Sequence, residues 1–160
     1  MKTALIIDGN YILSKNTFSL AKNNLLYGAL MQTLENSLSN YKNWYGFTQT
    51  YIVSDSREKS WRKGLDDKYK ANRKKDDKID WEFVYNTYTE FKNNVKENHK
   101  NTKVLESSTI EGDDWISYLV HKLNKEGIST IIITNDYDIK QLVKYNTNPN
   151  VMNIMSNEMY

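Results

Sequence analysis

Cysteine is absent from this 160-residue chain, and proline occurs once. Without cysteine the chain forms neither a disulfide nor a cysteine-ligated zinc site, and we expect it to work in a reducing compartment such as the cytoplasm. Long apolar runs are also absent, since none approaches the roughly 20 residues that a helix needs to cross a bilayer. The apolar stretch near the N-terminus is broken by Asp8, so we predict neither a signal peptide nor a membrane partner.

Charge is unevenly distributed along the chain. The formal net charge is only +2, yet ten lysine and arginine residues lie between Arg57 and Lys78. Most of the acids that follow predicted strands or open predicted helices lie outside this basic segment. A basic segment set apart from acidic clusters is typical of a protein that binds phosphates while it also holds cations.

Short apolar runs alternate with amphipathic stretches, which predicts an α/β fold with a mostly parallel central sheet flanked by helices. The expected strands are residues 3–7, 49–53, 102–105, 130–134 and 151–155. The expected helices are residues 20–45, 81–98 (with Asp80 as N-cap), 111–124 and a further one from 139. We expect Asp8 and Gly9 to form a turn, and Gly127 to end the third helix in a left-handed conformation.

Seven acidic residues are expected to meet at one edge of this sheet. Asp8 and Asp55 follow predicted strands directly, and the others follow another strand or open a helix: Glu111, Asp113, Asp114, Asp136 and Asp138. The carboxyl ends of parallel strands share one edge, where such folds bind ligands. Crowded carboxylates repel one another unless cations compensate, and Mg²⁺ prefers oxygen ligands. Two such ions about 3.5–4 Å apart can activate water against a phosphodiester.

Each group also has an ordinary structural interpretation. Asp8-Gly9 is a common turn sequence, acids in a first helical turn complement the helix dipole, and Asp136 could cap the following helix. The basic run could be a solvated face, although Trp61 and Tyr69 lie among its cations and could stack on bases. The coincidence of four acidic groups at one predicted edge favours function.

Five motifs occur in the order found in a known family. They are IIDGN at 6–10, VSDS at 53–56, WRKGLDDKYKANR at 61–73, EGDD at 111–114 and TNDYDIKQL at 134–142. Together they resemble the 5′→3′ exonuclease and flap-endonuclease family, and the resemblance covers nearly the whole chain.

The resemblance implies one domain over residues 1–160, with a PIN-like core, a basic helical arch and two Mg²⁺ or Mn²⁺ ions. It implies removal of RNA primers or 5′ flaps from DNA or an RNA–DNA hybrid, in a phage-infected or bacterial cytoplasm. By motif, the metal ligands would be Asp8, Asp55, Glu111, Asp113, Asp114, Asp136 and Asp138. Lys70 and Arg73 would hold the scissile phosphate, and Tyr69 would stack on a displaced base. Further nucleic-acid contacts are expected from Arg62, Lys63, Lys74 and Lys75.

Family members continue into a helical DNA-binding lobe, whereas this sequence stops at Tyr160. Either the chain is a truncated product, or a second polypeptide supplies the lobe. Two other functions stay open. One is a PIN-type ribonuclease that cuts single-stranded RNA, and the other is a non-catalytic module that binds DNA forks.

Overall fold

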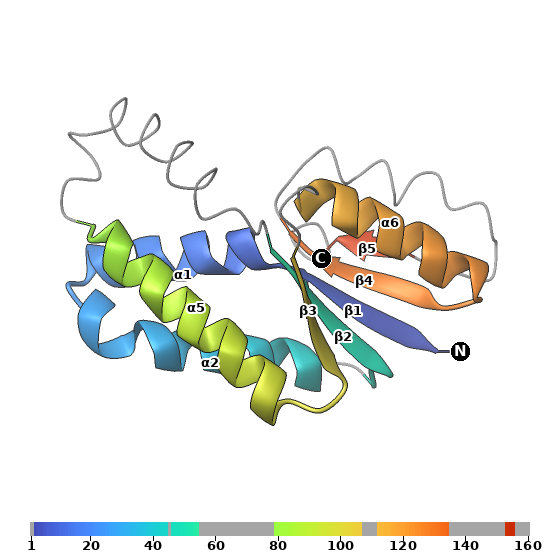
Figure 1. Cartoon of the computed structure of the whole chain (residues 1–160), viewed down its shortest axis with the longest axis horizontal. Coiled ribbons are helices and arrows are strands. Elements are labelled where there is room, and N and C mark those ends of the chain that lie inside the picture. Colours follow the sequence, from blue (N-terminus) through green and yellow to red (C-terminus); the bar gives the residue numbers. More distant parts are fainter. Residues whose placement is uncertain (1, 45, 55–78, 107–111, 135–152, 156–160) are drawn as a thin grey trace.

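The computed structural model describes residues 2–44, 46–54, 79–106, 112–134 and 153–155, with the side chains of 112–114 and 153–155 left out. Three predicted segments therefore lie outside the described residues. They are the basic arch at 57–78, the turn at 135–138 and the helix from 139. Within the described parts, a sheet separates two layers of helices (Figure 1).

The sheet has five parallel strands in the order β3-β2-β1-β4-β5. The strands are β1 (Thr3–Asp8), β2 (Gln49–Val53), β3 (Thr102–Leu105), β4 (Ser129–Ile133) and β5 (Asn153–Met155). The mostly parallel sheet predicted from the sequence is confirmed, with strand bounds within two residues of those expected.

Strand β1 lies at the centre of the sheet and is buried on both faces. Leu5 and Ile7 pack into one hydrophobic cluster, and Ala4 and Ile6 pack into the other. All four are at most 1% exposed. A strand buried on both faces has a continuous apolar sequence rather than an alternating one, which explains the run Ala4–Ile7.

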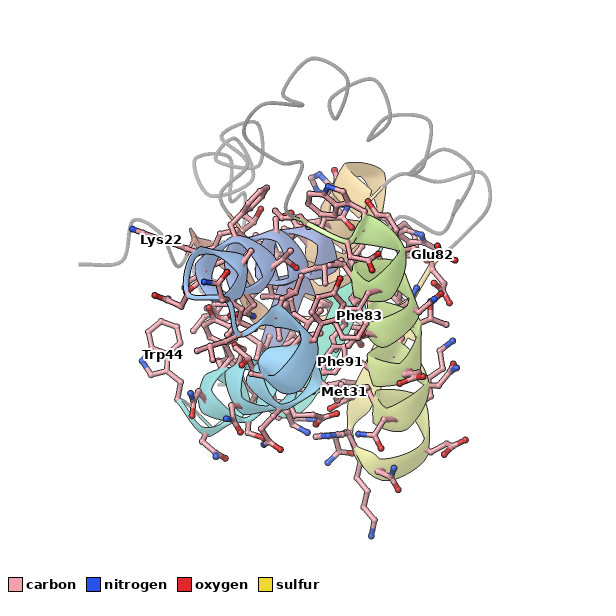
Figure 2. The ribbon with its side chains drawn as sticks, turned by 90° about the vertical axis from the view of Figure 1, so that its left-hand side faces the viewer. Lys22, Met31, Trp44, Glu82, Phe83 and Phe91 are labelled. Atoms are coloured by element: carbon pink, nitrogen blue, oxygen red, sulfur yellow. The ribbon has the colours of Figure 1, made fainter. Side chains whose placement is uncertain are left out.

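Helices α1 (Gly9–Lys22), α2 (Leu26–Asn43) and α5 (Trp81–Asn98) cover one face, and α6 (Gly112–Lys125) covers the other (Figure 1). Each presents an apolar stripe to the sheet or to a neighbouring helix, as predicted for α5 and α6. Figure 2 shows Phe83 and Phe91 of α5 turned toward α1 and α2, whereas Lys22 and Trp44 point away from the helices.

Two local predictions were wrong at the start of the chain. Gly9 does not form a turn but begins α1, and the single helix expected over 20–45 is two helices, α1 and α2. Asn24 separates them with a φ of 58°, a left-handed conformation that asparagine tolerates better than most residues. The buried face of α1 includes Asn16 and Thr17, and these polar residues hid its helical periodicity.

Two predicted helix ends are confirmed. The side chain of Asp80 accepts a hydrogen bond from the Phe83 amide at 3.1 Å and so caps α5. Gly127 follows α6 with a φ of 77°, which only glycine adopts without strain. Among the described helices, none is both long and apolar enough to cross a membrane.

Candidate functional site

The strand order reverses direction at β1. From β1 the chain adds β2 and then β3 on one side, and it afterwards returns to place β4 on the other side. In parallel α/β sheets, ligands bind beyond the carboxyl ends of the strands at such a switch point. Asp8 ends β1 at this position, directly beside β4.

The carboxylate of Asp8 is held in place by the first turn of α1. Its Oδ1 accepts hydrogen bonds from the backbone amides of Asn10 at 3.1 Å and Tyr11 at 3.4 Å, so Asp8 is the N-cap of the helix. These amides have no partner within the helix, and the positive end of the helix dipole favours a negative charge there. Local sequence therefore fixes an acidic side chain at the switch point.

The second oxygen of Asp8 is bound by the strand across the switch point. The Thr134 hydroxyl donates a hydrogen bond to Asp8 Oδ2 at 2.8 Å. Thr134 is the residue after β4, and its side chain is fully buried. Donors from α1 and from the end of β4 thus orient both carboxylate oxygens.

A buried tyrosine of α5 reaches the ends of the two neighbouring strands. The Tyr88 hydroxyl donates to Ser54 Oγ at 3.0 Å, and Ser54 directly follows β2. The same hydroxyl lies against Gly9, where an added Cβ would collide with it and would lie 3.0 Å from the Val53 carbonyl oxygen. Glycine at position 9 therefore permits this close approach.

Two ion pairs connect α5 to the end of β3. Lys92 Nζ lies 2.9 Å from Oε2 of Glu106, the residue after β3, and Lys96 Nζ lies 3.2 Å from Oε1. Burial alone would raise the pKa of the Glu106 carboxyl, but the hydrogen bonds and charges of Lys92 and Lys96 outweigh it and lower that pKa. Lys92 Nζ also lies 4.7 Å from the centroid of the Tyr88 ring.

The first turn of α6 contains Asp113 and Asp114, whose backbone is described. Helix α6 ends at Lys125, shortly before β4 begins at Ser129, so it runs antiparallel to β4 and its first turn lies toward the carboxyl ends of the strands (Figure 1). Ile116 packs in one cluster with Val53, the last residue of β2. The helix backbone thus brings both acids toward the edge that holds Asp8.

The remaining site residues predicted from the sequence lie outside the described residues. They are Asp55, Arg62, Lys63, Tyr69, Lys70, Arg73, Lys74, Lys75, Glu111, Asp136 and Asp138. Two of them are close in sequence to described residues at the edge, since Asp55 follows Ser54 and Asp136 follows Thr134 by two positions.

The donor chemistry at this edge suits a hard divalent cation. The described side chains that meet there, Asp8 and Thr134, present oxygen atoms, which Mg²⁺ and Mn²⁺ prefer. The described part of the chain, taken alone, contains no cluster of three or more acidic or histidine side chains arranged for a metal. The side chains of the other acids predicted as ligands lie outside the described part of the chain.

Sequence reasoning missed the residues that orient Asp8 and the strand ends. Thr134 and Ser54 each stand between a strand and a predicted acid, in TND and in SD. This shared pattern of a hydroxyl residue before the acid was available in the sequence. No local sequence signal marks Tyr88, because its contact with Ser54 spans 34 positions.

A doubly wound parallel sheet with a fixed carboxylate at its switch point is the arrangement of α/β proteins that bind ligands at the carboxyl edge. Comparison with known families makes the assignment specific. Residues 3–160 match the model of the N-terminal resolvase-like domain of 5′-3′ exonucleases, and the chain belongs to this family. The predicted family resemblance is confirmed.

Two relatives show the extent of the similarity. The chain is 29% identical to a 5′-3′ exonuclease of Buchnera aphidicola over 99% of its own length and 54% of the relative. It is 32% identical to ribonuclease H of phage T4 over 66% of its own length and 35% of that protein. The chain thus spans about half of the first relative and a third of the second.

Solved structures share the fold. The zinc-bound 5′-exonuclease of phage T5 superimposes with a TM-score of 0.70 at 16% identity, over 98% of this chain and 56% of that one. A phage T5 flap endonuclease, solved as a pseudo-enzyme-product complex with DNA and metal ions, gives a TM-score of 0.63 at 15% identity, with the same coverage.

Proposed function

We propose that the chain is the catalytic core of a divalent-metal-dependent 5′ nuclease that hydrolyses phosphodiesters in RNA primers or 5′ flaps on DNA. The observation that carries the proposal is Asp8, a carboxylate held at the switch point by α1 and by Thr134 at 2.8 Å. Family membership supports it, as do the metal ions and DNA in the phage T5 complex.

In this proposal Asp8 is one ligand of a site for two Mg²⁺ or Mn²⁺ ions. The other ligands are Asp55, Glu111, Asp113, Asp114, Asp136 and Asp138. Bound Mg²⁺ supplies positive charge at the phosphate and makes a bound water easier to deprotonate. The α1 amides and Thr134 keep the Asp8 carboxylate oriented, so little reorganisation is needed when the cation binds.

The basic segment lies in sequence between two described residues of the fold. The described chain stops at Ser54, which lies at the carboxyl edge, and resumes at Ile79, just before the cap of α5. We infer that Lys70 and Arg73 neutralise charge on the scissile phosphate, while Tyr69 stacks on a base. Arg62, Lys63, Lys74 and Lys75 would bind neighbouring phosphates.

The experiment that tests this proposal is single-turnover cleavage of a labelled 5′-flap substrate in Mg²⁺ by wild type, Lys70→Ala and Arg73→Ala. Loss of a preorganised group that acts in the transition state should slow cleavage by roughly 100- to 1000-fold. Affinity for the flap, measured in Ca²⁺, should fall far less, because ordinary phosphate contacts are shared among many cations.

Lys125→Ala is the matched control, since Lys125 is exposed in the last turn of α6, toward the opposite edge of the sheet. It should cleave at the wild-type rate. Unchanged rates in Lys70→Ala and Arg73→Ala at saturating enzyme would contradict their catalytic role. Cleavage of single-stranded RNA in preference to flaps would favour the PIN-type ribonuclease, and binding without any cleavage in Mg²⁺ or Mn²⁺ would favour the fork-binding module.

A further inference from the structure

Tyr88 has a hydroxyl where the hydrophobic core needs none. Its side chain is 3% exposed and packs in the main cluster, with its ring stacked 6.3 Å from that of Phe91. Phenylalanine would fill this space equally well. A buried hydroxyl loses its hydrogen bonds to water and is stable only with a protein partner. The structure supplies that partner as Ser54, at 3.0 Å.

A lysine of the same helix also contacts the ring of Tyr88. Lys92, one helical turn further along α5, lies over the ring face with Nζ 4.7 Å from the centroid. Lys92 itself is held by Glu106, 2.9 Å away, and its side chain is only 13% exposed. A cation that is partly buried and paired in this way has little freedom, so it restrains the aromatic ring beneath it.

One face of α5 therefore contacts the residues that follow three strands. Lys92 binds Glu106 after β3, the Tyr88 hydroxyl binds Ser54 after β2, and the same hydroxyl lies against Gly9 after β1. Ser54 directly precedes Asp55, and Gly9 directly follows Asp8. The contacts thus act on the backbone next to two proposed metal ligands that come from different strands.

We propose that Tyr88 is a positioning residue for the metal site. Its hydroxyl fixes the ends of β1 and β2 relative to each other, and so fixes the spacing of the backbone segments that carry Asp8 and Asp55. The inference rests on the proposed function, because the spacing matters only if both carboxylates bind cations. Groups that orient metal ligands typically contribute about 10- to 100-fold to metal affinity or activity.

The test is Mn²⁺ binding to the intact chain, measured without substrate by the electron paramagnetic resonance signal of free Mn²⁺. Tyr88→Phe removes the hydroxyl and keeps the ring, and it should weaken Mn²⁺ binding by about 10-fold. Single-turnover flap cleavage should need correspondingly more metal and recover at saturating Mn²⁺. Ser54→Ala should also weaken Mn²⁺ binding, and the double variant should lose less affinity than the sum of the two single effects, because both single variants remove the Tyr88–Ser54 contact.

Tyr41→Phe is the control, since Tyr41 packs against the same core near the end of α2, toward the opposite edge of the sheet. It should bind Mn²⁺ as wild type does. If Tyr88→Phe does not fold, the Mn²⁺ affinity of Ser54→Ala tests the positioning role. Suppose that the wild-type chain binds Mn²⁺ and cuts flaps. Wild-type Mn²⁺ affinity in both Tyr88→Phe and Ser54→Ala would then overturn the positioning role and leave the proposed function intact. A wild-type chain that neither binds Mn²⁺ nor cuts would overturn both.

Discussion

At the scale of single residues, Asp8 combines two roles: it caps a helix, and in the proposed function it binds a cation. Its carboxylate caps α1 through the amides of Asn10 and Tyr11, and it accepts a hydrogen bond from Thr134. Capping requires only an oxygen acceptor, which asparagine also provides, whereas cation binding requires the negative charge. Substitution can therefore separate the two roles.

We expect Asp8→Asn to abolish metal-dependent cleavage while the free energy of unfolding changes little, because asparagine is as good an N-cap as aspartate. Asp8→Ala should also abolish cleavage and should in addition lower the free energy of unfolding by about 1 kcal/mol. Urea denaturation and single-turnover flap cleavage measure the two effects.

Asp80→Asn is the control for these variants, because Asp80 caps α5 in the same way through the Phe83 amide. It should be nearly as stable as wild type and should still cleave flaps. An Asp8→Asn chain that cleaves at the wild-type rate would show that the charge of Asp8 is not needed.

The second prediction at the residue scale concerns the effect of substituting Gly9 on stability. Alanine normally stabilises a helix relative to glycine by about 1 kcal/mol. At position 9, however, the added methyl group would collide with the Tyr88 hydroxyl and press on the Val53 carbonyl. We expect Gly9→Ala to lower the free energy of unfolding by about 1–3 kcal/mol, as overpacked core sites do.

Gly28→Ala is the matched comparison, since no atom lies within 4 Å of a Cβ added at Gly28 in α2. This variant should gain stability, by up to about 1 kcal/mol. Equal effects of the two substitutions in chemical denaturation would contradict the close packing of Tyr88 on Gly9.

The sequence indicated the acid at the end of β1 but not the residues that orient it. Asp8 could be predicted because a charged residue directly after a buried strand is visible in the sequence alone. The hydrogen bond from Thr134 joins residues 126 positions apart, and it depends on β4 lying beside β1. Such partners follow from strand order, which no local pattern specifies.

At the scale of elements, α5 joins the sheet to the helical layer through both apolar and charged contacts. Its predicted apolar stripe is confirmed, with Val84, Phe91 and Val95 fully buried. The ion pairs of Lys92 and Lys96 with Glu106 could not be predicted in the same way, because they depend on how α5 crosses β3. The same holds for His99, whose Nε2 lies 3.0 Å from Glu35 Oε2 of α2.

The Glu106 ion pairs predict a dependence of stability on pH. The pKa of Glu106 is lowered below its usual 4.5 in the folded chain, so the folded state binds fewer protons than the unfolded state around that pH. The stabilisation is therefore present above pH 4.5 and is lost as the pH falls through the lowered pKa. We expect a contribution of about 1 kcal/mol or less, because solvent screens these partly exposed pairs.

Urea denaturation between pH 6 and pH 3 measures this contribution. Glu106→Gln should be less stable than wild type at pH 6, and the difference should shrink toward pH 3. Glu90→Gln removes an exposed carboxylate from the same helix and serves as the control. A stability difference between Glu106→Gln and wild type that stays constant over this range would contradict the assignment.

At the scale of the whole molecule, the reversal of strand order at β1 places the site. The alternation of strands and helices was predictable, because most strands are short apolar runs and most helices show an apolar stripe. The return of the chain from β3 to a place beside β1 was not predictable. It reflects which packing of helices and strands buries the most apolar surface. This return is what brings Thr134 to Asp8.

The central claim is that the acids at the carboxyl edge form one cation site, and metal-directed cleavage of the chain tests it most directly. Fe²⁺ substituted for Mg²⁺, with ascorbate and peroxide, cuts a polypeptide backbone only near the bound ion. We expect cuts near residues 8–9, 54–55, 111–114 and 134–138, competed away by Mg²⁺ and lost in Asp8→Asn. Cuts at the opposite edge, near residues 48, 102 or 128, or no Mg²⁺-sensitive cuts at all, would contradict the account.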